Sequence, residues 1–345
     1  PLLRLINRNK YFIIQSFTSS TIYHKEKKSL LFDISCYHPF DLPWLSLYFF
    51  LSLKPQKYII TRHDIWPGHI VIASLLKISI YYINANIHKN SIWLKWYCKP
   101  LSHYIFHKFK RTIVPSKEIA NNLYELDILK DNIMICNDSR FDQVQYRKDK
   151  GENKHILSNL ASNNYTTIFG SIDLQDEKII FKSLKLLYPL GTTDLINKKN
   201  RLIFAPHETD SNTINRLTKK LNDLSFKYCK YSEYSLHHNN DDVVIIDSVG
   251  ILADLYRYVN KAYIGGGFSR GVHSVIEPAI YNCSIGHGPN IEMLDEAKLL
   301  VNNHYSRIIS NYHDMNNFLF SEDINKTCDL FNKPGSETIL NHILS

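Results

Sequence analysis

Short apolar runs alternate with amphipathic stretches along most of this 345-residue chain. The apolar runs predict strands, and the stretches whose apolar positions recur every three or four residues predict helices. Strands that alternate with helices indicate parallel βαβ units. In the first half we expect strands at 11–17, 30–34, 57–61, 80–85, 113–115 and 133–136, and helices at 42–53, 70–77 and 116–126.

A polar stretch at 143–164 interrupts this alternation, and its composition is typical of a linker and a surface helix. Beyond it we expect strands at 166–170, 201–205, 243–247, 261–265 and 283–286, and helices at 175–187, 211–223, 250–258 and 273–282. Two successive α/β halves predict two Rossmann-like domains with parallel sheets facing a cleft. The expected divisions are a first domain over 1–146, a second over 147–322, and a helical segment over 323–345.

Seven of the twelve glycines lie between Gly250 and Gly288. Glycine occurs where the backbone needs a positive φ or a close approach to another group. This cluster follows an apolar run and precedes a helix-like run at 274–281, so a strand, a glycine loop and a helix start adjoin. That order predicts a phosphate cradle, because free N–H groups and the helix dipole point to one spot. Candidate contacts to the phosphate and ribose of a nucleotide are Arg270, His273 and Glu277.

Polar residues and glycines also follow other predicted strands. His207 can donate to a phosphate or a sugar hydroxyl, but a histidine that satisfies loop carbonyls is an equally good interpretation. The Gly170-Ser171 turn offers N–H groups at an equivalent strand end. The charged residues after the strand at 57–61 include Asp64, and an ordinary surface loop is the alternative there.

The amino-acid composition excludes few classes of function. The formal charge of +8 suits an anionic partner, but abundant Lys, Asn, Ile and Tyr are typical of an AT-rich genome, so the charge carries little weight. Six cysteines without a C-x-x-C pair predict reduced, buried thiols in a cytosolic environment and no metal site. The longest apolar stretch, 42–53, is too short to span a bilayer. It predicts a buried helix or, through Trp44 and Phe49, a helix that docks on a lipid surface.

Six segments add a more specific signal. In chain order they are TRHDIWPGHI, NDSRFDQV, FGSIDLQDE, RLIFAPHE, VVIIDSVGILADLY and YIGGGFSRGVHSVIEPAIYNCSIGHGPN. Together they resemble the motifs of the bacterial 3-deoxy-D-manno-octulosonic acid (Kdo) transferases, in the order in which that family carries them. The resemblance implies a glycosyltransferase B fold and metal-independent transfer of Kdo from CMP-Kdo to a lipid A precursor (lipid IVA). It implies action at the cytoplasmic face of the bacterial inner membrane, with no cofactor and no nucleic-acid partner.

The resemblance also implies roles for individual residues. Asp64 is expected on the acceptor side, as the one catalytic candidate in this sequence. The expected donor-binding residues are Gly170, Ser171, His207, Gly250, Gly265, Gly266, Gly267, Arg270, His273 and Glu277. The family's general base is a Glu in a Ser-x-Gly-Glu segment, which follows an anchor helix. Both lie upstream of the part of the family sequence that Pro1-Leu2-Leu3 resembles, so we expect neither the base nor the anchor helix within this sequence.

Two other functions compete with this interpretation. One is a glycosyltransferase B enzyme that uses another nucleotide sugar, such as a UDP-sugar transferase or epimerase. The other is a degraded homologue that binds nucleotide or anionic lipid without turnover. The family's Glu in the Trp-Pro motif is Asp64 here, and the Asn after the signature histidine is Ser274. Selective binding of CMP over UMP separates the first alternative from a Kdo transferase.

Overall fold

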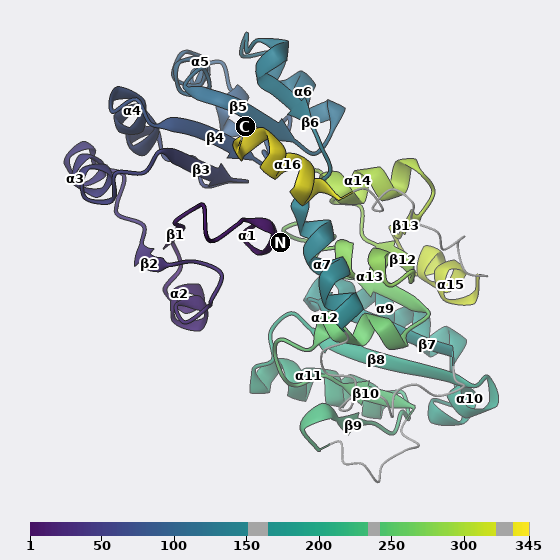
Figure 1. Ribbon diagram of the computed structural model, residues 1–345. Helices are drawn as coiled ribbons and strands as arrows, with labels where there is room; N and C mark the ends of the chain where they lie inside the picture. The colour runs from purple at the N-terminus through teal and green to yellow at the C-terminus, as the bar shows by residue number, and fades with distance from the viewer. Residues whose placement is uncertain (151–164, 234–241, 322–333, 345) are drawn as a thin grey trace. The chain divides into compact units, whose positions relative to one another are not determined.

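The computed structural model describes residues 1–150, 165–233, 242–321 and 334–344 (Figure 1). The chain divides into two compact units, which we call unit 1 (Pro1–Gln143 with Lys333–Ser345) and unit 2 (Val144–Asn332). Of the polar stretch at 143–164, expected to contain a linker and a surface helix, residues 143–150 belong to helix α7 (Ser139–Lys150) and the rest lies outside the described residues. Most of the segment expected at 323–345 also lies outside them, apart from α16 (Gly335–Leu344).

Unit 2 contains a parallel sheet in the order β13-β12-β11-β7-β8-β10-β9. The strands are β7 (Tyr165–Ile172), β8 (Asn200–Pro206), β9 (Cys229–Lys230), β10 (Val243–Ile245), β11 (Lys261–Ile264), β12 (Ser284–His287) and β13 (Ser306–Ile308). The chain begins at the centre with β7, builds outward through β8, and then crosses back to add β11 on the other side. The order therefore reverses between β7 and β11, and ligands bind such sheets outside the carboxyl ends of the strands at this point.

Helices cover both faces of this sheet. They are α9 (Leu174–Leu187), α10 (Thr192–Asn197), α11 (Ser211–Asp223), α12 (Leu252–Leu255), α13 (Ile276–Ile280), α14 (Asp295–Asn302) and α15 (Tyr312–Phe320). Successive strand residues belong to opposite cores: Ile168 and Ile203 pack in one apolar cluster, and Phe169 and Phe204 in the other. Side chains alternate across a strand, so a parallel sheet with two covered faces needs such continuous apolar runs.

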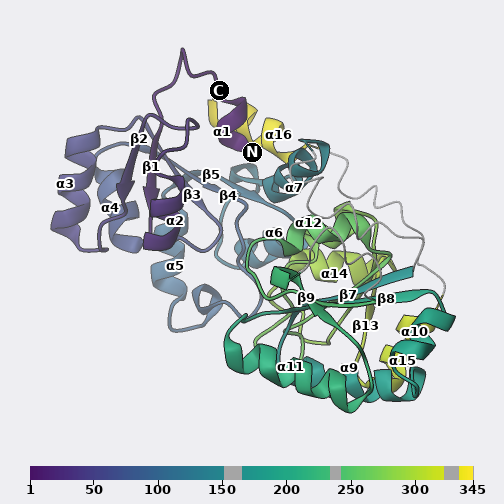
Figure 2. The same ribbon diagram turned by 90° about the horizontal axis from the view of Figure 1, so that it is seen from below.

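Unit 1 carries two separate parallel sheets, whose strands are labelled in Figures 1 and 2. One pairs β1 (Ile14–Phe17) with β2 (Ile34–Tyr37), and the other has the order β3 (Lys57–Thr61), β4 (Ser79–Ile83), β5 (Phe109–Val114) and β6 (Ile133–Ile135). The helices are α1 (Leu2–Leu5), α2 (Ser20–Glu26), α3 (Pro43–Leu53), α4 (Pro67–Leu75), α5 (Lys99–Phe106) and α6 (Lys117–Tyr124). Ser116 caps α6, as predicted, by accepting the N–H of Ile119 at 3.3 Å.

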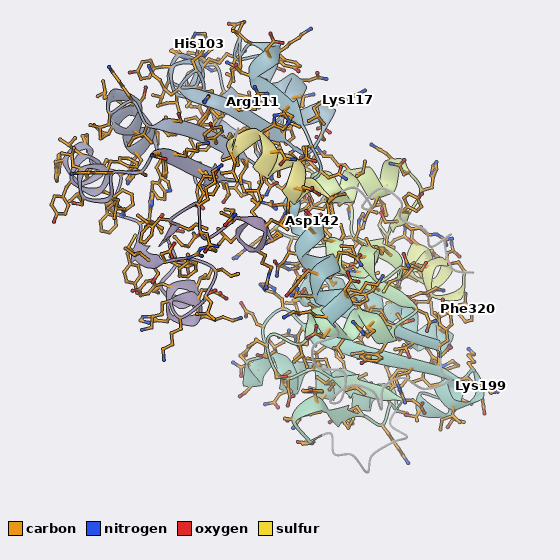
Figure 3. All side chains as sticks on the ribbon, in the orientation of Figure 1. His103, Arg111, Lys117, Asp142, Lys199 and Phe320 are labelled. Carbon is orange, nitrogen blue, oxygen red and sulfur yellow. The ribbon has the colours of Figure 1, made fainter. Side chains whose placement is uncertain are left out.

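The late helix α16 packs on unit 1 although unit 2 precedes it in the chain. Its Ile339 and Ile343 share an apolar cluster with Tyr81 and Ile83 of β4. The Asp142 carboxylate accepts the backbone N–H groups of Gly335 at 3.3 Å and Ser336 at 2.6 Å, which fixes the start of the helix. Figure 3 labels Asp142 on α7, near the first turn of α16.

The predicted α/β class with parallel sheets is confirmed, and several details are wrong. The strand expected at 30–34 begins only at Ile34, and Leu30 is 95% exposed. The helix expected at 273–282 is limited to the five residues of α13. Of the five cysteines that the structure describes, Cys283 alone is fully buried and the others are half-buried. No helix among the described residues is long and apolar enough to cross a membrane.

Candidate functional site

The loops after β11, β7 and β8 meet at the carboxyl edge of the unit 2 sheet, since these strands are neighbours. In the glycine loop after β11, a Cβ on Gly265 would lie 2.4 Å from the carbonyl oxygen of Ser171, and one on Gly267 would lie 2.6 Å from Gly288 Cα. Gly266 has a φ of +87°. Larger residues are therefore excluded here by neighbouring backbone, so this loop is tightly fixed.

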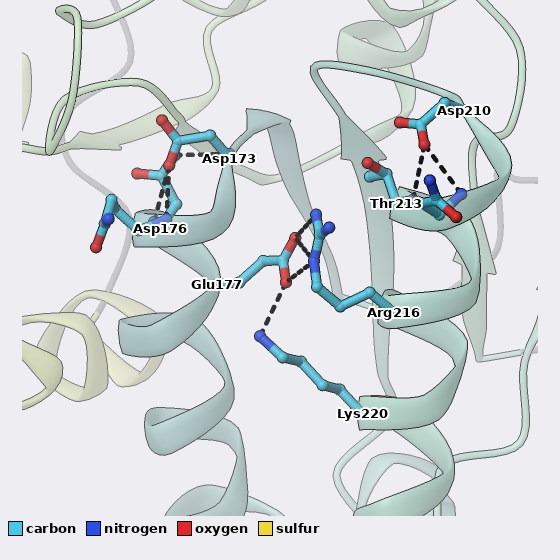
Figure 4. Close-up of polar contacts among 9 residues, drawn as sticks. Asp173, Asp176, Glu177, Asp210, Thr213, Arg216 and Lys220 are labelled. Carbon is cyan, nitrogen blue, oxygen red and sulfur yellow. Dashed lines mark hydrogen bonds and ion pairs between the residues drawn. The ribbon is translucent and has the colours of Figure 1, made fainter.

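Two carboxylates at the start of α9 hydrogen-bond to the glycine loop and fix its position. Asp176 accepts hydrogen bonds from the Gly266 N–H at 2.8 Å, the Tyr263 hydroxyl at 2.7 Å and the Asp173 N–H at 2.9 Å. Asp173 caps α9 (Figure 4). It also accepts a hydrogen bond from the hydroxyl of Ser269 in the glycine loop. Burial raises the pKa of the Asp176 carboxyl to about 6, against the lowering effect of its hydrogen bonds. The sequence analysis missed Asp176, although the spacing of Asp173 and Asp176 is that of an acidic capping box.

A second carboxylate of α9, Glu177, fixes α9 to α11 (Figure 4). It is fully buried and accepts two hydrogen bonds from Arg216, at 2.8 and 3.0 Å, and one from Lys220 at 2.8 Å. The hydrogen bond and charge of Glu177 raise the pKa of the Arg216 guanidinium. A buried carboxylate needs such partners, because an isolated charge in the interior is strongly unfavourable. The pair thus keeps α9, and the loop that α9 holds, in a fixed position.

Two histidines predicted at the donor site stack on each other. The rings of His207, after β8, and His273, after β11, lie 4.4 Å apart at 21°. Backbone hydrogen bonds fix both, from His207 N–H to the Ile172 carbonyl at 3.0 Å and from His273 N–H to the Gly265 carbonyl at 3.1 Å. Burial, and then the charge of His207, lower the pKa of His273, so its imidazole is neutral at neutral pH. A neutral ring can donate one hydrogen bond and accept another.

Glu277 lies on α13, half-buried beside the same loops. It accepts the Ser274 hydroxyl at 2.5 Å and lies 3.5 Å from the Arg147 guanidinium. Burial, and then the charge of Glu277, raise the pKa of the neighbouring Tyr256. A Cβ on Gly170 would meet the Tyr256 hydroxyl at 2.6 Å, so glycine at this position leaves room for the hydroxyl.

The other predicted donor residues are positioned less tightly. Arg270 is exposed and makes no ion pair with another described residue, and Ser171 has a φ of +53° at the end of β7. Gly250 has a φ of +93° after β10, and no atom lies within 4 Å of a Cβ placed there. Because α13 has only five residues, it contributes no long helix dipole to this edge of the sheet.

In unit 1, a polar group that the sequence analysis missed lies near Asp64. His69 is fully buried, its Nδ1 lies 2.8 Å from an Asp41 oxygen, and its ring stacks 4.4 Å from that of His38. Burial, and then His69, lower the pKa of His38 to about 4, while burial raises that of Asp64. Asp64 and His38 both line a cavity of about 870 Å³ that lies entirely within unit 1. Among the described residues no cluster of His, Cys, Asp and Glu has the arrangement of a metal site.

Comparisons with known proteins identify relatives of the chain. The family model "3-Deoxy-D-manno-octulosonic-acid transferase (kdotransferase)" matches residues 1–143. The chain is 25% identical over 315 residues to the 3-deoxy-D-manno-octulosonic acid transferase of Rickettsia felis, covering 88% of this chain and 63% of that protein. It is 23% identical over 301 residues to the Aquifex aeolicus enzyme of the same name, covering 86% and 74%. The chain thus spans less than two thirds of the Rickettsia felis relative.

Solved structures share the fold. The UDP-GlcNAc 2-epimerase of Methanocaldococcus jannaschii has a TM-score of 0.67 and 13% identity, covering 96% of this chain and 91% of that one. A glycosyltransferase of Rickettsia africae has a TM-score of 0.57 and 12% identity, covering 97% and 86%. At these identities the likeness shows the fold alone, which is that of the glycosyltransferase B group.

Proposed function

We propose that this chain transfers Kdo from CMP-Kdo to a lipid A precursor. It is similar to the Kdo transferases in sequence and to glycosyltransferase B proteins in fold. The observation that carries the proposal is the convergence of the motif residues at the carboxyl edge of the unit 2 sheet. His207 and His273 are 66 positions apart in the sequence, yet their rings stack there. Gly266 of the glycine loop lies directly against the His273 ring, and the sequence relatives named above are Kdo transferases.

Each of these residues has a role in the proposed donor site. The backbone N–H of Gly267 and the side chain of Arg270 bind the phosphate of CMP, while Gly265 and Gly266, whose N–H groups bond to the Gly170 carbonyl and to Asp176, hold the loop beside it. Glu277 accepts hydrogen bonds from the ribose hydroxyls, because a carboxylate accepts two donors at once. His207 and His273 contact the Kdo carboxylate or phosphate by donating hydrogen bonds. Ser171 and Gly250 line the edges of the site.

In the reaction, a hydroxyl oxygen of the acceptor forms a bond to the anomeric carbon of Kdo. The bond from that carbon to the phosphate oxygen breaks, and CMP leaves with the electron pair. The hydroxyl proton passes to a general base. Donors already directed at the departing phosphate stabilise its charge without reorganisation. Asp64 orients the acceptor hydroxyl in unit 1.

The test of the donor site is calorimetric titration with CMP, with UMP as the competing nucleotide. We expect selective CMP binding, and Glu277→Gln to weaken it roughly tenfold to a hundredfold, the range for a hydrogen bond to a charged group. Asp223→Asn, at the far end of α11, removes one charge away from the site and should leave the affinity unchanged. Equal binding of UMP would favour another nucleotide sugar. No binding by a folded sample would reject the donor site.

The acceptor implies contact with the cytoplasmic face of the inner membrane, and α3 supplies a surface for it. Trp44, Leu47, Tyr48 and Leu51 are exposed at spacings of three and four, so they share one face of the helix, and Trp44 and Tyr48 are 65% and 74% exposed. Aromatic and apolar residues on one helix face bind at lipid interfaces. The expectation that this helix is buried is correct only for its other face, with Ser46 and Phe50.

Sedimentation with phosphatidylethanolamine–phosphatidylglycerol vesicles tests this surface. The double variant Trp44→Ser and Leu51→Ser should lose most of the vesicle-bound fraction. Leu186→Ser, which removes an isolated exposed leucine from α9, should not. Equal sedimentation of all three proteins would show that α3 is not the contact.

A further inference from the structure

The C-terminal part of α7 belongs to unit 2 and contacts α13, the helix that carries Glu277. Lys148 Nζ donates a hydrogen bond to the Ile280 carbonyl at 2.6 Å, at the end of α13. The Lys148 carbonyl in turn accepts a hydrogen bond from the Arg257 guanidinium at 2.5 Å. These two contacts hold α7 against α13 and bring Arg147, the residue before Lys148, beside Glu277.

Arg147 approaches the Glu277 carboxylate from the side opposite to Ser274. The Arg147 guanidinium lies 3.5 Å from one carboxylate oxygen, and the Ser274 hydroxyl donates to the other oxygen at 2.5 Å. A charge-assisted N–H···O bond is usually about 2.7–2.9 Å long, so Arg147 attracts the carboxylate by its charge without forming a tight hydrogen bond. A carboxylate can accept roughly four donors. Positions therefore remain open for the two neighbouring hydroxyls of a ribose.

The surroundings of Arg147 do not favour a purely structural role. Its side chain is 38% exposed, yet its Nε is buried and has no hydrogen-bond partner among the described residues. A buried donor normally has a partner, and one without a partner lowers the stability of the fold. Arg216 shows the contrast, because its Nε and a terminal nitrogen both donate to Glu177, at 3.0 and 2.8 Å. Departures from such local rules are expected at functional sites.

We propose that Arg147 is a positioning residue, which holds the Glu277 carboxylate in the orientation that accepts both ribose hydroxyls. It thereby makes the site selective for ribonucleotides over nucleotides that lack these hydroxyls. This inference rests on the function proposed above, in which Glu277 contacts the ribose. A glutamate side chain that turns freely loses that freedom when it binds a diol, and the loss weakens binding. The charge of Arg147 and the hydroxyl of Ser274 restrict the carboxylate before the ligand arrives.

The test is calorimetric titration of each variant with CMP and with 2′,3′-dideoxyCMP, which lacks both ribose hydroxyls. The readout is the ratio of the two affinities, because a general loss of stability or of charge affects both ligands alike. In the parent protein we expect CMP to bind at least roughly tenfold more tightly, the lower value for one hydrogen bond to a charged group. Arg147→Met removes the charge and should reduce this ratio roughly threefold to tenfold, the effect of one side chain that must be immobilised on binding.

Two control variants accompany Arg147→Met. Arg147→Lys keeps the positive charge beside Glu277 and should retain most of the ratio. Lys219→Met removes one positive charge from an exposed position near the far end of α11, and should leave the ratio unchanged.

A double variant separates a role through Glu277 from a direct contact with the nucleotide. In the Glu277→Gln background, Arg147→Met should change the ratio by less than about twofold, because the carboxylate that it positions is absent. An unchanged ratio in Arg147→Met, or an equal loss in both backgrounds, would overturn this proposal while the parent protein still binds CMP selectively. Absence of CMP binding by the folded parent protein would overturn the proposed function and this inference together.

Discussion

Asp176→Asn should remove a pH dependence from the stability of unit 2. The Asp176 carboxyl is fully buried, and its pKa is about 6 in the folded protein against 3.8 for the unperturbed group. A raised pKa of an acid favours the protonated form in the fold. The contribution to stability is therefore fully present below pH 3.8 and is lost as the pH rises through about 6. At about 1.4 kcal/mol per pKa unit, ionised Asp176 costs the fold up to about 3 kcal/mol near neutral pH.

The asparagine variant keeps the shape and the hydrogen bonds. Its carbonyl oxygen can accept the N–H groups of Gly266 and Asp173, and its amide can donate to the hydroxyl oxygen of Tyr263. Other groups of unit 2, such as His273, titrate in both proteins. We therefore expect the change in the stability of unit 2 from pH 4.5 to pH 7.5 to be more favourable in Asp176→Asn than in the parent protein, by up to about 3 kcal/mol. Urea dependence of amide exchange in β7 and β11 measures this difference in unit 2.

All four tryptophans of the chain, at positions 44, 66, 93 and 96, belong to unit 1. Tryptophan fluorescence therefore follows the unfolding of unit 1 alone and supplies an internal control, which the substitution should not change. The reasoning is refuted if the parent protein and Asp176→Asn show the same change in β11 exchange between the two pH values.

Two further substitutions test the contacts that fix the units internally. Arg216→Ala leaves Glu177 with Lys220 as its cation. We expect the free energy of unfolding of unit 2, measured by amide exchange in β7, to fall by about 2–3 kcal/mol, the value of a hydrogen bond to a charged group. A loss below about 0.5 kcal/mol, which is typical of surface substitutions, would show that Arg216 does not fix α9 to α11. Asp142→Ala removes the acceptor for two N–H groups at the start of α16. We expect this change to destabilise unit 1 by about 1–3 kcal/mol, as measured by tryptophan fluorescence during urea unfolding. An unchanged urea midpoint would show that apolar packing alone holds this helix.

The bounds of helices and strands are predicted best where a segment has a distinct pattern of apolar residues. The strand β3 and the helix α11 have the predicted bounds, since each has its own signal: a short run with β-branched residues, or apolar residues every three or four positions. The helix α2 was missed because its residues, Ser20–Glu26, are polar and exposed and carry no apolar stripe. The shift of β2 to Ile34 has a related cause, because two adjacent leucines at 30 and 31 imitate a buried strand.

The residues of the candidate site were easier to predict than the residues that hold the site loops in position. Glycines and histidines after strands stand out in the sequence, so the loops that carry His207 and His273 were predicted. Asp176 was not, because its contact with Gly266 spans 90 positions and exists only because β7 and β11 are neighbours. Strand order in a sheet is set by tertiary packing, and no local pattern records it. The same holds for the contact of His69 with Asp41.

The return of α16 to unit 1 has a consequence for folding during synthesis. This helix covers Tyr81 and Ile83, but the ribosome makes it only after all of unit 2. At roughly 5–20 residues per second, the 189 residues from Val144 to Asn332 delay its arrival by about 10–40 s. Unit 2 is made without interruption, so it can complete its fold first. Until then the nascent unit 1 exposes an apolar sheet face, the kind of surface that chaperones bind.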